Sequence, residues 1–230
     1  WVIRDVEGRY LGWQEGQFVS QIPSAYPIFQ ALGIEPLSHR ELYLPVASYT
    51  LQAPADPPQA FDYAFFGDGR MIGAEGDLRL TTSSYEMSVS PDLEQTTIAG
   101  LQNLETLNLT FIHEQPDSSR VAAIFGDLIS GEAVLTGHFD GDQLVISRAN
   151  GSLRYQLSLG HHGNQPGEFI SAAVELGPTE EHILKPINWD GLGSSAIILE
   201  IDRGSDGTID ETRTLTNLAE RQYLPSVIWK

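Results

Sequence analysis

Residues 144–157, with the sequence LVISRANGSLRYQL, decide the fold of this chain. Two strand-like runs, 144–148 and the alternating 153–157, flank the dipeptide Asn150-Gly151. Alternation with a period of two is typical of a half-buried strand, and Asn-Gly accepts the positive φ angles of a type I′ turn. The pattern predicts a β-hairpin. The turn sequence Asp140-Gly141-Asp142 extends it to a three-strand meander.

Similar strand-like runs cover most of the remaining sequence. They span residues 42–44, 48–52, 61–66, 77–81, 85–89, 104–112, 120–125, 133–136, 168–175, 183–189, 196–202 and 208–215. Helical signals are confined to residues 25–32 and 217–222, one or two turns each. Many short strands separated by Gly and Pro predict an all-β fold built of antiparallel β-sandwich units with few short helices.

The composition excludes several classes of protein. The 230 residues are 41% hydrophobic, enough to bury a sizeable core. Lys and Arg number 13 against 31 Asp and Glu, which gives a formal charge of −18 and argues against a nucleic-acid partner. The chain has no Cys, so it has no disulfide, thiol nucleophile or Cys-ligated metal. No apolar run is long enough for a membrane helix, and we expect no membrane insertion.

We expect two modules with a boundary near Ser90-Pro91-Asp92, where the alternating pattern stops and restarts. The N-terminal β-sandwich module would span residues 1–90 and the C-terminal one residues 91–230. The sequence opens on Trp1-Val2-Ile3-Arg4, which is typical of the middle of a strand. We therefore expect the chain to be a processed piece of a longer protein, whose upstream domains are its first partners.

The N-terminal third contains several short motifs in a fixed order. The segment Asp5-Val6-Glu7-Gly8-Arg9-Tyr10-Leu11-Gly12 has the pattern D-x-x-G-R-x-x-G, and Ile22-Pro23-Ser24-Ala25 has the pattern I-P-x-A. Leu44-Pro45 and Tyr49-Thr50-Leu51 follow. In this order the motifs resemble an uncharacterised β-sandwich accessory module of exported multidomain bacterial proteins. The resemblance covers residues 1–90 and implies an extracellular or cell-surface location. It brings no catalytic residues.

An aspartate-rich segment near the C-terminus resembles the calcium loops of exported bacterial proteins, D-x-D-x-D-G-x-x-D. Asp202, Asp206 and Asp210 occupy the first, fifth and ninth positions, and the Thr208 carbonyl occupies the seventh. Calcium prefers six to eight oxygen ligands, so these residues are candidate Ca²⁺ ligands. Gly204 stands where the third position requires a ligand, which weakens the site. An ordinary Ser-Asp-Gly hairpin turn explains the segment equally well.

No catalytic residue can be assigned. The sequence contains no G-x-S-x-G, Walker or dinucleotide-binding motif. His161-His162 is expected in a flexible loop, where metal binding would require His113, His138 or a carboxylate to approach. Its many acidic residues are interpreted as a solvated surface.

The sequence leaves three functions open. The first is a non-catalytic, extracellular structural or adhesive region of a larger protein, stabilised by Ca²⁺. The second is a carbohydrate-binding module or hydrolase-associated domain, in which Trp13 or other aromatic side chains bind a cell-surface polysaccharide. The third is a self-assembling surface-layer or filament subunit, because strand edges can pair.

Overall fold

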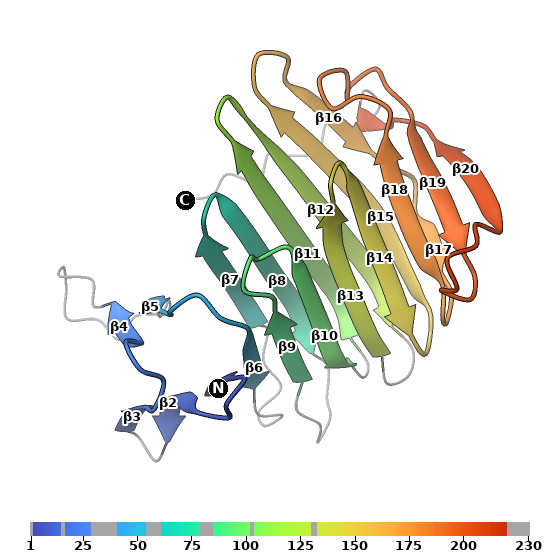
Figure 1. Cartoon of the computed structure of the whole chain (residues 1–230). Coiled ribbons are helices and arrows are strands. Elements are labelled where there is room, and N and C mark those ends of the chain that lie inside the picture. Colours follow the sequence, from blue (N-terminus) through green and yellow to red (C-terminus); the bar gives the residue numbers. More distant parts are fainter. Residues whose placement is uncertain are drawn as a thin grey trace.

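The computed structural model describes residues 2–14, 17–28, 41–53, 61–78, 85–101, 104–129 and 133–219. These residues form twenty strands and no α-helix, which confirms the all-β prediction. Two large antiparallel sheets lie one over the other (Figure 1). In the described part of the chain, no helix has the length and hydropathy to cross a membrane.

The larger sheet contains eleven strands. They are β1 (Val2–Asp5), β2 (Tyr10–Gln14), β3 (Gln17–Ser20), β6 (Tyr49–Ala53), β9 (Tyr85–Val89), β10 (Gln95–Leu101), β13 (Ala133–Asp140), β14 (Gln143–Ala149), β18 (Glu181–Pro186), β19 (Ile197–Asp202) and β20 (Glu211–Leu215). Their order across the sheet is β20-β19-β18-β14-β13-β10-β9-β6-β1-β2-β3.

The smaller sheet contains seven strands. They are β7 (Phe61–Gly67), β8 (Arg70–Leu78), β11 (Leu104–Gln115), β12 (Ser118–Ile129), β15 (Leu153–His162), β16 (Gly167–Ile170) and β17 (Val174–Leu176). Six of them follow the order β16-β15-β12-β11-β8-β7, and β17 also pairs with β15. Strands β4 (Tyr26–Ile28) and β5 (Glu41–Tyr43) form a separate two-stranded sheet.

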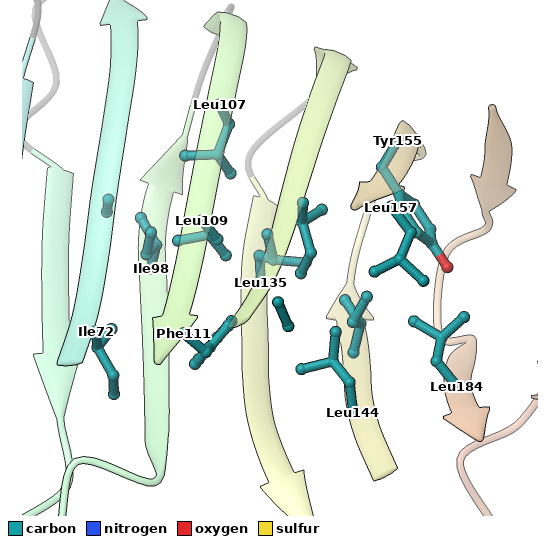
Figure 2. Close-up of a cluster of buried hydrophobic side chains, with 14 of the residues drawn as sticks. Ile72, Ile98, Leu107, Leu109, Phe111, Leu135, Leu144, Tyr155, Leu157 and Leu184 are labelled. Atoms are coloured by element: carbon teal, nitrogen blue, oxygen red, sulfur yellow. The ribbon is translucent and has the colours of Figure 1, made fainter. Parts of the chain in front are cut away.

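The core lies between the two large sheets. Alternate residues of each strand point inward, as Leu107, Leu109 and Phe111 do on β11 (Figure 2). The sheets approach closely where Phe111 lies over Gly137 of β13. A Cβ atom added to that glycine would lie 2.7 Å from the Phe111 ring. Close contact at this point therefore requires a residue without a side chain.

The predicted hairpin at Asn150-Gly151 is wrong, although the turn itself is present. Asn150 and Gly151 both have positive φ, at 69° and 65°. However, β14 pairs with β13 and β18 in the larger sheet, whereas β15 pairs with β12 in the smaller one. The turn therefore carries the chain from one sheet to the other. The meander is reduced to the hairpin of β13 and β14.

Two further local predictions need correction. The helical turn expected over residues 25–32 is wrong where the structure describes it, because Tyr26–Ile28 forms β4 and pairs with β5. Stacking of Tyr26 on Tyr43, with ring centroids 4.9 Å apart, favours this pairing. The run 168–175 is not one strand but β16 and β17, with residues 171–173 between them. Residues 29–32 and 220–222 lie outside the described part.

The boundary predicted near residue 90 falls within a single sheet. Strands β9 and β10, on either side of it, are hydrogen-bonded neighbours. The buried apolar cluster also contains residues from both sides, from Ile3 to Ile201. The two expected modules therefore share one sheet and one core.

Candidate functional site

The aspartate-rich segment forms the turn between β19 and β20. Asp202 is 1% exposed, and its carboxylate accepts hydrogen bonds from the backbone N–H groups of Gly204, Asp206 and Gly207 at 3.1, 3.2 and 2.6 Å. Burial on its own raises the pKa of Asp202, but these N–H groups outweigh it, so the pKa lies below the ordinary value of 3.8. Asp202 thus closes the turn as a backbone acceptor.

The other proposed calcium ligands are exposed. The Asp206 carboxylate accepts the Thr208 N–H at 2.8 Å, and the Asp210 carboxylate accepts the Arg203 N–H at 2.8 Å. Among the described residues, no three acidic or histidine side chains are grouped closely enough to hold a metal ion. Hydrogen bonds therefore suffice to close the turn. Calcium binding by Asp202, Asp206, Thr208 and Asp210 stays a prediction.

Four basic side chains lie side by side across one end of the smaller sheet. Arg70, His113, Arg120 and His161 are direct partners on β8, β11, β12 and β15. Each lies two residues beyond an inward-pointing core residue, which places it on the inner side of the sheet. We call these four residues the basic row.

Acidic residues from turns of the larger sheet face the basic row. Arg70 pairs with Glu94 at 2.6 Å, from the turn between β9 and β10. Arg120 pairs with Asp142, from the turn between β13 and β14. His161 Nε2 lies 3.7 Å from Asp190, which follows β18. Each of these contacts joins one sheet to the other.

A small cavity lies at this end of the sandwich. Its volume is about 70 Å³, and Arg70, Glu94, His113, Phe111 and Phe139 are among its lining residues. Burial lowers the pKa of His113, and the charges of Arg70 and Arg120 lower it further. The imidazole is therefore neutral near pH 7 and can both donate and accept a hydrogen bond.

Trp189 closes the same end of the sandwich. Its ring lies under the Arg120 guanidinium, 5.2 Å from centroid to Cζ, and its Nε1 donates to the Asp142 carbonyl at 3.1 Å. The side chain is buried, so it is not a surface on which a sugar could stack. Cation–π contact and the indole hydrogen bond fix Arg120 and Asp142 against each other.

The opposite end of the interior contains Arg148, Tyr155 and His182, which we call the inner cluster. Tyr155 of β15 and His182 of β18 share a hydrogen bond of 2.9 Å across the two sheets. Burial lowers the pKa of His182 to about 4, so the ring is neutral near pH 7. Its Nε2 lies 3.7 Å from Glu180 and, in the described part of the chain, has no hydrogen-bond partner.

Arg148 lies near the C-terminal end of β14, and only 4% of the residue is exposed. Its Nε donates to the Asn150 carbonyl at 2.6 Å, whereas Nη1 and Nη2 have no hydrogen-bond partner among the residues that the structure describes. Burial lowers the pKa of Arg148 to about 10, so the side chain is still charged near pH 7. A buried charge without a counter-charge is costly, which makes this position a source of instability.

The sequence prediction for the histidines is partly wrong. His161 and His162 do not lie in a flexible loop but end strand β15. Because neighbouring side chains on a strand point to opposite sides, His161 is buried and His162 is exposed, and the two cannot hold one ion together. His113 does lie on the same row as His161, but Arg120 separates them. His138 belongs to the larger sheet.

Strand register would have identified the basic row, but the sequence does not fix register between distant strands. Arg148 gives an earlier signal, because it falls on the apolar side of the alternation in residues 144–148. The side chain of Trp13 lies outside the described part.

Comparisons with protein-family models, curated proteins and solved structures found no match for this chain.

Proposed function

We propose that this chain is a non-catalytic, extracellular structural module of a larger exported bacterial protein. The observation that carries the proposal is that the two arginines of the basic row form ion pairs with acidic residues of the facing sheet. Arg70 and Arg120 are each paired with an acid from the facing sheet, so their charges are engaged in contacts between the two sheets. A catalytic acid or base needs free access to a substrate, whereas these groups are engaged in joining the two sheets.

The continuous core supports the same function. Eleven strands of one sheet come from both sides of the expected boundary, and one buried apolar cluster spans it. A continuous sheet and core suit a module that spaces or presents neighbouring domains. The charge of −18 favours solubility outside the cell and suppresses nonspecific binding to anionic surfaces.

Surface proteolysis tests this proposal. Trypsin added to intact cells of the source organism should release peptides of this chain, and the purified protein should not turn over ester, glycoside or phosphoester substrates. Peptides recovered only after lysis would contradict the extracellular location. Saturable turnover that is lost in His113→Ala but kept in the matched surface variant His162→Ala would contradict the non-catalytic function.

Calcium stabilisation of the turn at 202–210 is part of this proposal. Its support is the aspartate pattern in a strongly acidic chain. At a Ca²⁺ concentration equal to Kd the gain is RT ln 2, about 0.4 kcal/mol, and it grows with concentration. The melting temperature should rise with millimolar Ca²⁺ and this rise should be absent in Asp206→Ala. An equal melting temperature in Ca²⁺ and in chelator would remove calcium from the proposal.

A carbohydrate-binding function is the second candidate, and the cavity beside His113 favours it. A neutral imidazole and the Glu94 carboxylate can bind hydroxyl groups, and Phe139 supplies an apolar wall. The cavity would accept only one edge of a sugar ring. Binding of a polysaccharide that is weakened by His113→Ala, and not by His162→Ala, would support this function. No retention on any polysaccharide tested would argue against it.

A further inference from the structure

Two central rows on the outer face of the smaller sheet carry no charge from β7 to β15, and the row beside them begins with Asp62 and Glu75. One of the two rows consists of Phe66, Met71, Ile112, Val121 and Gly160, which are direct partners in register, and it continues to Glu168 of β16. The next row consists of Ala64, Gly73, Thr110, Ala123 and Ser158 and continues to Ile170 of β16. We call these two rows the uncharged face. Phe66 is 74% exposed there.

The outer face of the larger sheet is different. Its corresponding central row consists of Thr50, Ser88, Thr97, Thr136 and Ser147, all of which carry hydroxyl groups. Thr97 and Thr136 hydrogen-bond to each other at 3.1 Å, and Lys185 pairs with Glu200 at 2.5 Å on the same sheet. The hydroxyl groups of this row can bind water, whereas an exposed apolar side chain such as Phe66 on the uncharged face is typical of a contact surface.

The described chain ends beside the uncharged face. Asn217 accepts the Ile170 N–H at 3.0 Å and donates to the Glu168 carbonyl at 2.7 Å, and the Leu218 N–H donates to the Ile170 carbonyl at 2.8 Å. Residues 217–218 therefore follow the free edge of β16. The described part of the chain therefore ends at the β16 edge of the uncharged face.

We propose that residues 220–230 dock across the uncharged face, from β16 toward β7. This segment, ERQYLPSVIWK, has five large apolar residues, Tyr223, Leu224, Val227, Ile228 and Trp229. Extended, its eleven residues span about 36 Å. The six strands of the face span about 24 Å, so the segment can cross it. The length of the segment, the point at which the described chain ends and the apolar residues of the segment all support residues 220–230 as the occupant of the uncharged face.

The lack of native Cys makes disulfide trapping a direct test. Ser226→Cys is combined with Thr110→Cys on the uncharged face, and the matched control combines it with Thr136→Cys on the hydroxyl row. At low protein concentration the first pair should form an intramolecular disulfide at least about tenfold faster, because docking raises the effective concentration of the two thiols. Equal rates for the two pairs would overturn the proposal.

Trypsin cleavage after Arg221 gives a second measurement. Docking should protect this bond, and Thr110→Glu should speed its cleavage by about tenfold, since a carboxylate on the apolar face opposes docking. The matched variant Thr136→Glu should cleave at the wild-type rate. A disulfide between two chains, or a dimer by light scattering that Thr110→Glu abolishes, would instead make a second copy the occupant and overturn the proposal.

Discussion

The two ends of the interior differ in how their charged and titratable groups are paired and how deeply they are buried. At the basic row, Arg70 and Arg120 meet Glu94 and Asp142 close to water. At the inner cluster, Arg148 and His182 are almost completely buried, and within the described part of the chain three of their nitrogen atoms have no hydrogen-bond partner. Arg120 of the basic row has one such atom, Nε. About six residues of β15, or roughly 20 Å, separate the two ends.

The contacts between the sheets at the two ends therefore differ in how strongly they affect the stability of the fold. The acidic side chains that face the basic row, Glu94 and Asp142, are 45% and 70% exposed, so solvent screens each pair and its net contribution to stability is small. In the inner cluster, the Tyr155–His182 hydrogen bond is shielded from water but requires a neutral ring. We therefore expect mutations and pH to act strongly on the inner cluster and weakly on the basic row.

The largest expected effect is that of acid on His182. Its pKa of about 4 in the folded chain lies below the ordinary 6.5. Between these values the unfolded chain binds a proton that the folded chain does not, so stability is lost as pH falls from 6.5 to 4. The gap corresponds to about 3 kcal/mol of unfolding free energy, which urea unfolding across this pH range would measure.

The variant His182→Gln should flatten this pH dependence. The matched variant His162→Gln replaces an exposed histidine on β15 and should leave the slope unchanged. A slope that is the same in both variants and in the wild type would show that His182 does not control the acid sensitivity.

The second effect concerns Arg148. Replacing it with Met should raise the free energy of unfolding by about 1–2 kcal/mol, because a flexible apolar side chain removes the buried unpaired charge. Chemical denaturation at neutral pH measures the change. A loss of stability greater than about 1 kcal/mol would show that the guanidinium has a counter-charge in the folded protein.

The smallest effect is expected at the basic row. Asp142→Asn should lower the free energy of unfolding by less than about 1 kcal/mol, since Asp142 is largely exposed. Raising the salt concentration should shrink the difference further. A loss of unfolding free energy above about 2 kcal/mol that does not change with salt would show that the Arg120–Asp142 pair behaves as a buried ion pair. The two ends of the interior would then not differ in the way proposed.

The alternating pattern predicts most strands because period two directly reports which residues face a core. Residues 104–112 and 120–125, for example, fall within β11 and β12. Pairing is harder to predict. Asn150-Gly151 fixes the local φ angles, but the turn does not decide whether the strands that leave it pair or enter facing sheets. That choice depends on β18 and β12, which compete for β14 and β15.

The candidate site was predictable only in part. Arg148 falls on the apolar side of its run, and the burial of an Arg there follows from alternation. The basic row depends on register among four strands that span residues 70 to 162 of the sequence. Nothing local in His113 or Arg120 indicates that they become neighbours, and the acids that face them come from turns whose position depends on the second sheet.

A double-mutant cycle on Tyr155 and His182 tests the central claim most directly, namely that the turn at Asn150-Gly151 joins two facing sheets of one sandwich. The unfolding free energies of Tyr155→Phe, His182→Leu and the double variant are compared with that of the wild type. The hydrogen bond across the sheets predicts a coupling energy of about 1 kcal/mol or more at pH 7. Additive effects within about 0.3 kcal/mol would contradict it, because they would mean that these residues do not meet.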